Sequence, residues 1–221
     1  MKPGASLIER SSVAVPAAEV VLNGDLSIPA NPKGMILFAH GSGSSRLSPR
    51  NRYVAEALNE HSLATLLVDL LTAQEEEEDE VTRHIRFDIA LLTRRLVAIT
   101  DWLASPPQAR GRGIGLFGAS TGAAAALLTA AERPEIIKAV VSRGGRPDLA
   151  GETAALVQAP TLLIVGGRDT EVLELNREAM ARMKCPAELK IVPGATHLFE
   201  ERGALAQVAS MAADWFTAHL A

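Results

Sequence analysis

The 221-residue sequence is poor in several residue types, and each shortage excludes a class of protein. A single cysteine, Cys185, rules out a disulfide framework within the chain and a cysteine-rich metal site. No apolar run without charges reaches the length of a membrane span, and residues 1–20 lack the continuous apolar core of a signal peptide. The formal net charge of −4 offers no basic stripe for nucleic acid. We therefore expect a cytoplasmic protein with neither a nucleic-acid partner nor a membrane partner.

What the sequence does contain is a series of short aliphatic runs. The hydrophobic share of 48% and the charged share of 22% are ordinary for a globular protein, and the length fits a single domain over residues 1–221. The runs are nearly continuous rather than alternating, which is typical of strands covered on both faces in a parallel sheet. They read GMILFAH, LATLLVDL, GIGLFGA, KAVVSRGG, APTLLIVGG and ELKIVPG.

Helical patterns alternate with these runs. One apolar stripe recurs at spacings of three and four and indicates an amphipathic helix that Pro106-Pro107 ends. Further helices are predicted over residues 50–61 and in TGAAAALLTAAE, EVLELNREAMARM and ALAQVASMAADWFTAHL. The alternation predicts a doubly wound α/β domain with a mostly parallel sheet and no room for a cap domain. The residues of the stripe are Ile85, Ile89, Leu92, Leu96, Ile99 and Leu103.

Two local signals complete the predicted fold. The stretch EVVLNGDLSIP predicts an N-terminal hairpin, with two strands joined at Asn23-Gly24. The acidic run Glu75–Glu80 predicts a solvated loop or the frayed start of a helix. A metal-binding patch is the less favoured interpretation of that run, because adjacent carboxylates on a loop point in different directions. We expect no metal and no cofactor.

A serine, an aspartate and a histidine follow three of the predicted strands, in that order. Ser120 follows GLFGA, Asp169 follows LLIVGG, and His197 follows KIVPGAT. The carboxyl ends of the strands meet at one edge of such a sheet, where functional groups gather. A serine hydroxyl needs a neighbouring base to become a nucleophile, and a histidine can take its proton and return it to a leaving group. An aspartate can fix the tautomer of that histidine.

Each of these residues has a structural alternative. Ser120 could simply be a small residue in a tight turn, and Asp169 could cap the helix that follows it. Asp69, after an earlier strand, is the reserve acid. Four other histidines compete with His197, but their positions favour helix ends or, for one of them, the shaping of a loop. They are His40, which follows the strand GMILFA, and His61, His84 and His219.

The stretch Gly118-Ala119-Ser120-Thr121-Gly122 matches the G-x-S-x-G nucleophile elbow and lies between a strand and a helix, as that motif requires. With the order Ser, Asp, His and the stretches FAHGSGSS and GGRDTEV, the chain resembles the small, lidless, dienelactone-hydrolase-like branch of the α/β-hydrolase superfamily. The resemblance covers the chain from about Val20 onward. The dienelactone hydrolases proper have a cysteine nucleophile, whereas the serine here favours the broader assignment of esterase.

Backbone amides and arginines complete the predicted site. The amide of Thr121, at the start of a helix, is one expected donor to an oxyanion, and the resemblance implies the Ser42 amide as the second. Arg143 and Arg46 are candidates for binding a carboxylate or phosphate of the substrate. The alternatives are that Arg143 buttresses loops and that Arg46, with Arg50, decorates a helix start.

The sequence therefore predicts a serine hydrolase that cleaves carboxylic esters or lactones of small molecules through an acyl-enzyme. Acyl transfer, thioester hydrolysis and peptide cleavage by the same triad remain open. So does a catalytically silent protein that serves as a ligand receptor or scaffold. The chain could be a monomer or a homodimer.

Overall fold

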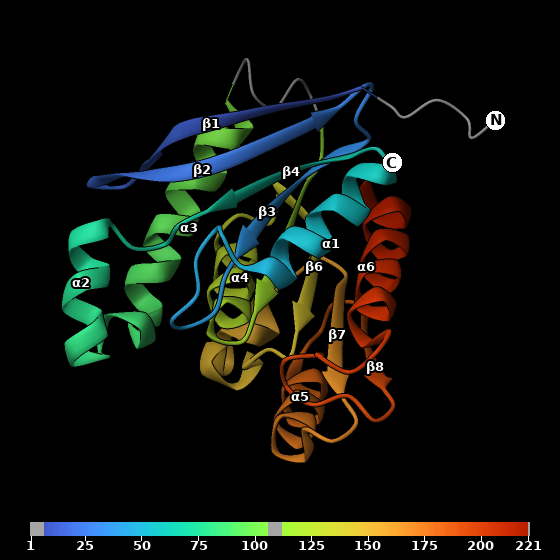
Figure 1. The fold of residues 1–221 in the computed structure, drawn as a ribbon. Coiled ribbons are helices and arrows are strands. Elements are labelled where there is room, and N and C mark those ends of the chain that lie inside the picture. The colour runs from blue at the N-terminus through green and yellow to red at the C-terminus, as the bar shows by residue number, and fades with distance from the viewer. Residues whose placement is uncertain (1–6, 106–111, 221) are drawn as a thin grey trace.

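An eight-stranded, mostly parallel β-sheet runs through the centre of the molecule (Figure 1). The computed structural model describes residues 7–105 and 112–220. β2 pairs antiparallel with β1 and with β4, and the other neighbours are parallel, in the order β1-β2-β4-β3-β5-β6-β7-β8. The strands are β1 (Ile8–Ala17), β2 (Val20–Pro29), β3 (Gly34–Ala39), β4 (Leu63–Val68), β5 (Ile114–Ala119), β6 (Ile137–Arg143), β7 (Thr161–Gly166) and β8 (Ala187–Val192).

Helices cover both faces of this sheet, so that the predicted doubly wound α/β fold is confirmed. α1 (Pro49–Glu60) and α6 (Ala204–Leu220) pack on one face, and α3 (Ile89–Ala104) and α4 (Thr121–Glu132) pack on the other. All residues of β3, β4, β5 and β7 are buried, which explains why their sequences are apolar without alternation. α5 (Thr170–Arg182) packs beside β7.

The connection between β6 and β7 is short. It consists mainly of η2 (Pro147–Leu156), a 3₁₀ helix interrupted at Gly151, where φ is 55°. No cap domain covers the sheet edge within the described ranges, as the sequence predicts. None of the helices described has the length and apolar content that crossing a bilayer requires.

The N-terminal hairpin forms, but the prediction of its turn at Asn23-Gly24 is wrong. The turn lies at Ala18-Glu19, where Ala18 has a φ of 55°. Asn23 and Gly24 lie inside β2. A Cβ on Gly24 would approach side-chain atoms of Val15 and Leu66 to 2.9 Å. The glycine therefore makes room for side chains packed over the strand, and the sequence signal for a turn was a signal of close packing.

The acidic run Glu75–Glu80 is neither a loop nor frayed, which corrects the second local prediction. It lies inside α2 (Ala73–Thr82), whose start carries a capping box. The Thr72 hydroxyl accepts a hydrogen bond from the Glu75 amide at 3.2 Å, and the Glu75 carboxylate accepts one from the Thr72 amide at 2.8 Å. The same carboxylate pairs with Arg95 on α3 at 2.6 Å. The start of the run is ordered because its first carboxylate, that of Glu75, has partners on both sides.

The amphipathic stripe is divided between two elements. α3 begins at Ile89 because Asp88 caps it, accepting a hydrogen bond from the Leu91 amide at 2.9 Å. Ile85 precedes the helix and belongs to the short 3₁₀ helix η1 (Ile85–Phe87). α3 ends at Ala104, and Pro106-Pro107 lies outside the described residues.

Candidate active site

Ser120 lies on a strained turn between β5 and α4. Its φ of 51° and ψ of −123° are unusual for a residue with a side chain, and its hydroxyl makes no capping hydrogen bond to the helix. A Cβ on Gly118 would approach the Cα of Ala123 to 2.5 Å, and one on Gly122 would approach the carbonyl oxygen of Ala39 to 2.3 Å. Only glycine fits at these two positions, so the G-x-S-x-G spacing allows strand and helix to meet this closely.

Asp169 and His197 meet in the structure. Nδ1 of His197 lies 2.6 Å from Oδ2 of Asp169, and the two residues follow the neighbouring parallel strands β7 and β8. Asp169 stands at the N-terminus of α5, but its side chain makes no capping hydrogen bond there. The Asp169 side chain therefore contacts His197 and does not cap α5. The bond to Nδ1 leaves Nε2 of His197 as the nitrogen available to a substrate or nucleophile.

Ser120 and His197 both adjoin the backbone at the end of β6. The Ser120 amide donates a hydrogen bond to the carbonyl of Arg143 at 3.3 Å. A Cβ placed on the next residue, Gly144, would lie 3.5 Å from Cε1 of His197. Among the described residues no hydrogen bond joins the Ser120 hydroxyl to the imidazole, a looseness common in free enzymes. The three predicted triad residues thus lie around one short piece of backbone.

The two amides predicted to bind an oxyanion differ in their contacts. The Ser42 amide donates to the hydroxyl Oγ1 of Thr121 at 3.0 Å, and the two hydroxyl groups lie 2.9 Å apart. For the Ser42 amide to stabilise an oxyanion, it must exchange this hydroxyl for the substrate oxygen. The Thr121 amide has no backbone acceptor outside its helix among the described residues and points from the first turn of α4.

His40 holds the loop that carries Ser42. Its Nε2 accepts a hydrogen bond from the Leu70 amide at 3.0 Å, so Nδ1 carries the ring proton and donates it to the Gly41 carbonyl at 3.0 Å. Burial lowers the pKa of His40 below its usual value, and the Gly41 carbonyl and the charge of Asp69 oppose that shift. His40 is therefore a neutral histidine that shapes the loop, the role the sequence favours for it.

The remaining histidines lie away from this edge. His61 caps the C-terminus of α1 and is exposed, and His84 is exposed before η1. The ring of His219, near the end of α6, lies 4.5 Å from that of Trp215. Of the histidines the structure describes, only His197 contacts a carboxylate at the carboxyl edge of the sheet.

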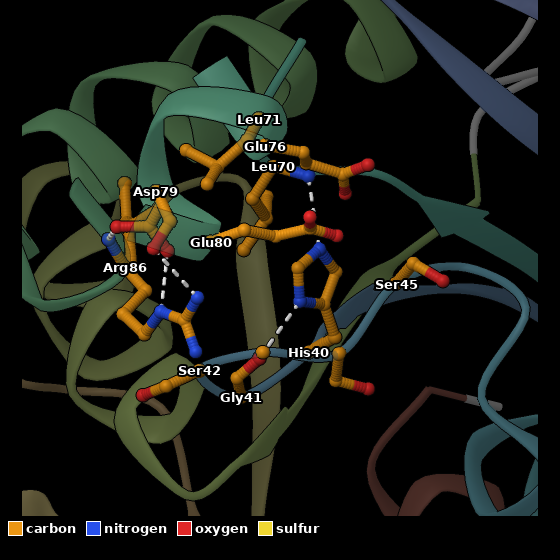
Figure 2. A pocket seen from close by; sticks show the side chains of 13 residues that line it. His40, Gly41, Ser42, Ser45, Leu70, Leu71, Glu76, Asp79, Glu80 and Arg86 are labelled. Carbon is orange, nitrogen blue, oxygen red and sulfur yellow. Dashed lines mark hydrogen bonds and ion pairs between the residues drawn. The ribbon is translucent and has the colours of Figure 1, made fainter. Parts of the chain in front are cut away.

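A cavity of about 360 Å³ is lined in part by the loop that carries Ser42. The residues labelled in Figure 2 show that α2 and η1 form its far wall, opposite His40. Arg86 donates to Asp79 there, and a Cβ on Gly43 would approach the Arg86 guanidinium to 2.9 Å. This cavity was not predicted from the sequence, because residues 75–80 were expected to form a solvated loop or the frayed start of a helix where the ordered helix α2 stands. Its lining consists of residues 40–45, Leu70, Leu71, Glu76, Asp79, Glu80, Arg86 and Leu92.

The two candidate arginines have opposite surroundings. The guanidinium of Arg46 pairs with the carboxylate of Asp69, and the Arg46 backbone amide donates to the same carboxylate at 2.8 Å. These contacts favour a structural role for Arg46 over substrate binding. They also favour a structural role for Asp69 over that of the reserve acid. Arg143 is 8% exposed, and its Nε and Nη1 have no hydrogen-bond partner among the described residues. Burial, followed by the charge of Arg50, lowers the pKa of Arg143 to about 10. Arg143 remains a cation at neutral pH.

Neither the single cysteine nor a cluster of metal ligands provides a second reactive site among the described residues. Cys185 is half-buried, and burial raises the pKa of its thiol, so it lacks the thiolate character of a nucleophile. In the part of the chain that the structure describes, no group of three or more histidine, cysteine or carboxylate side chains is placed to hold a metal ion.

Comparison with known proteins identifies the relatives of this fold. The model of the dienelactone hydrolase family matches residues 23–220. The crystal structure of a dienelactone hydrolase from Anabaena variabilis is 56% identical, with a TM-score of 0.95 over 97% of this chain and 99% of that chain. Est1E from Butyrivibrio proteoclasticus is 18% identical, with a TM-score of 0.77 over 94% of this chain and 98% of its own, and shares the fold.

Two proteins from Mycobacterium tuberculosis, strains CDC 1551 and H37Rv, are named "Putative phosphoribosyl transferase" and are 56% identical over 208 residues. The matching segment covers 94% of this chain and 46% of theirs. The chain thus spans about half the length of the curated relatives it matches.

Proposed function

This chain belongs to the dienelactone hydrolase family, and from that membership and the geometry around Ser120 we propose that it is a serine hydrolase of carboxylic esters or lactones. The observation that carries the proposal is the hydrogen bond of 2.6 Å between Asp169 and His197, formed beside a serine on a strained, glycine-flanked turn. A structural turn would need neither the strain nor the paired histidine.

The proposed reaction begins with attack of the Ser120 hydroxyl oxygen on the ester carbonyl carbon. His197 takes the hydroxyl proton at Nε2, while the Asp169 carboxylate stabilises the resulting imidazolium. The tetrahedral intermediate collapses as the proton passes from His197 to the leaving alcohol, and an acyl-Ser120 ester remains. A water molecule then attacks that ester with His197 again as base, releasing the acid and restoring the serine.

Charge on the tetrahedral oxygen needs donors on the side of the carbonyl away from His197. We assign this role to the Thr121 amide, whose helix N-terminus adds a favourable dipole. The Ser42 amide joins it once the substrate oxygen replaces the Thr121 hydroxyl. Loss of one such donor typically reduces kcat about 100- to 1,000-fold.

Covalent labelling tests the proposal directly. A fluorophosphonate probe should label Ser120 in the wild-type chain and in Ser210→Ala, a control on the exposed surface of α6. Ser120→Ala should lose both the label and the hydrolysis of aryl esters. An unlabelled wild-type protein that hydrolyses no member of a series of aryl esters, lactones and thioesters would instead support a ligand receptor or scaffold.

The name of the Mycobacterium tuberculosis relatives does not replace this proposal. It belongs to proteins of about twice the length, and more than half of each lies outside the segment that this chain matches. The matched segment is the one that corresponds to the elbow and to the paired histidine. We therefore assign ester hydrolysis to this segment, and the name adds esters of phosphorylated sugars to the substrate series that should be tested.

A further inference from the structure

Arg143 ends β6 on the face of the sheet that α1 and α6 cover. Successive side chains of a strand point to opposite faces. Ala139 and Val141 pack with the α1 and α6 core, and Arg143 follows them at the same spacing. The intervening Ser142 hydroxyl lies on the α4 side, near Gly145. The Arg143 side chain therefore leaves the backbone at the residue whose carbonyl binds the Ser120 amide, next to Gly144, which adjoins His197. From there it extends toward the α1 side of the site.

The other buried arginine of the described chain, Arg95, has a carboxylate partner, and Arg143 does not. Arg95, which is 1% exposed, is held by Glu75 at 2.6 Å and by a backbone carbonyl at 2.7 Å. Even the partly exposed Arg46 and Arg86 are paired with aspartates. Arg143 is 8% exposed, yet no carboxylate among the described residues lies within ion-pair distance of it, and two of its nitrogens have no acceptor. An unpaired buried cation is costly to retain, so an anion that pairs with it would bind favourably.

A second guanidinium adds to the positive charge at this position. The charge of Arg50, in the first turn of α1, acts on Arg143. Nε of Arg50 is also buried without an acceptor, and its Nη1 contacts only Glu200 at 3.3 Å, a carboxylate that is two-thirds exposed. The first turn of α1 contains no acidic residue, so the positive end of the helix dipole is not offset by a side chain.

We propose that Arg143 and Arg50 bind a phosphoryl group of the substrate, so that the hydrolase proposed above cleaves esters of phosphorylated molecules. This inference rests on the proposed function. A carboxylate has two oxygens and one charge, which a single guanidinium satisfies, and the second guanidinium would still repel the first. A phosphoryl group carries about −1.5 to −2 charges at neutral pH and three acceptor oxygens, which suits two guanidiniums.

The placement also limits the substrate. The Arg143 carbonyl accepts from the Ser120 amide, so the bound phosphoryl group and the attacked carbonyl lie within one arginine side chain of each other. The substrate should therefore carry its phosphoryl group a few bonds from the ester. A phosphorylated polyol or sugar ester has this form, whereas a long unsubstituted acyl chain does not.

Binding of inorganic phosphate tests the site without any turnover. At constant ionic strength and about 100 times its Kd, phosphate should raise the Tm of the wild-type chain by about 5 °C or more relative to chloride. Arg143→Met and Arg50→Met should lose most of that rise. Arg94→Met, which removes an exposed arginine on α3, should keep it. A phosphate-dependent rise that persists undiminished in Arg143→Met would overturn the proposal.

The free Arg143→Met chain should be at least as stable as the wild type, because it no longer buries an unpaired charge. If the variant does not fold, Arg143→Lys decides the question, since it keeps the charge and loses the planar fork. Arg143→Lys should raise KM for a phosphorylated ester about tenfold or more while kcat changes little. An unchanged KM with a reduced kcat would point to a structural role and overturn the proposal.

Three matched aryl esters that differ only in a neutral, carboxylate or phosphoryl substituent identify the group. The wild type should prefer the phosphoryl ester in kcat/KM, and Arg143→Met should lower that preference about 10- to 100-fold. A preference for the carboxylate ester, or for the neutral one, overturns the phosphoryl assignment. If no ester is hydrolysed but phosphate still stabilises the wild type through Arg143, the proposed hydrolase fails and the phosphate site stands.

Discussion

Oδ2 of Asp169 lies 2.6 Å from Nδ1 of His197, a contact between residues that are 28 positions apart in sequence. The two side chains follow strands β7 and β8, which are parallel neighbours, so the sheet itself sets their separation. The imidazole is 38% exposed and the carboxylate 15%. Asp169 is therefore the more enclosed partner, and the imidazole of His197 is the more exposed one.

We expect Asp169→Asn to reduce kcat for an ester substrate by about 10⁴-fold with little change in KM. An amide NH2 in the place of Oδ2 donates a hydrogen bond to Nδ1 instead of accepting one from Nδ1–H, so the ring proton moves to Nε2 and that nitrogen can no longer act as a base. Steady-state kinetics of the purified variant measure the effect, and circular dichroism checks that the fold is intact.

Asp69→Asn is the matched control, because Asp69 also follows a strand of the same sheet. Its carboxylate pairs with Arg46 and not with a histidine. The substitution should cost stability and leave most of kcat in place. If Asp69→Asn were the variant that lost 10⁴-fold in kcat and Asp169→Asn retained activity, the assignment of the acid would be wrong.

Ser120→Gly should stabilise the protein while abolishing ester hydrolysis. Serine at a φ of 51° and a ψ of −123° stores strain of about 1–3 kcal/mol, which glycine relieves. The greater freedom of glycine in the unfolded chain costs about 0.4–1 kcal/mol, so the net gain is about 1 kcal/mol. Urea denaturation measures it.

Ser45→Gly provides the comparison for this strain. Ser45 lies in the loop before α1 and is not among the residues of positive φ in the described chain, so its replacement has no strain to relieve. It should lose a few tenths of a kcal/mol to about 1 kcal/mol. Equal losses in the two glycine variants would show that the Ser120 turn stores no strain.

The features of the candidate site that sequence could place in the fold are those fixed by local pattern. The G-x-S-x-G spacing requires glycines where β5 and α4 approach. In the structure the backbone of Ala123 packs against Gly118, and the backbone of Ala39 packs against Gly122. Asp169 and His197 could be placed at one edge because parallel strands all end there. Their hydrogen bond follows from the strand order, which repeated β–α units largely determine.

The parts that sequence did not predict depend on contacts between distant segments. Asn23-Gly24 has the sequence of a turn, but Gly24 is needed for packing against Leu66, which lies on another strand. Whether Arg143 has a partner depends on which side chains α1 and the loop after His197 bring near it. No motif records the absence of a carboxylate, so its unpaired state became visible only in the folded chain.

His40 should make stability fall as the pH falls below about 6.5. Burial lowers the pKa of His40 in the folded protein, whereas the unfolded chain keeps a pKa of about 6.5. Between these two values the unfolded state binds the additional proton, so unfolding becomes easier with acid, by at most about 1.4 kcal/mol per pH unit. The contribution is complete above about pH 6.5 and is lost progressively below it.

Denaturation at pH 5, 6, 7 and 8 measures this effect, with His40→Gln as the test variant. The variant should be less stable at pH 7, because the bond to the Leu70 amide is disturbed, and its stability should change less between pH 7 and pH 5. His61→Gln, at an exposed position, should keep the wild-type slope. A wild-type slope in His40→Gln would mean that another group titrates in this range.

The ion pair between Glu75 and Arg95 should be the most costly of the acidic-run contacts to break. Arg95 is 1% exposed and its guanidinium is bound by both oxygens of Glu75, at 2.6 and 2.8 Å. Glu75→Gln leaves that cation without its counter-charge, while the glutamine oxygen can still accept the Thr72 amide and keep the capping box, so we expect a loss of about 3 kcal/mol in the free energy of unfolding from the ion pair. Glu77→Gln, on the exposed side of α2, should change it by about 0.5 kcal/mol or less.

A double-mutant cycle separates the ion pair from the cap. Arg95→Met with Glu75→Gln should be more stable than the sum of the two single losses predicts, because the double variant buries no unpaired charge. The hydrogen bonds from Arg95 lower the pKa of Glu75, so the coupling should be present near pH 7 and should fade as the pH falls through the acidic range in which Glu75 is protonated. Strict additivity at pH 7 would mean that the capping box alone, and not the ion pair, orders the start of α2.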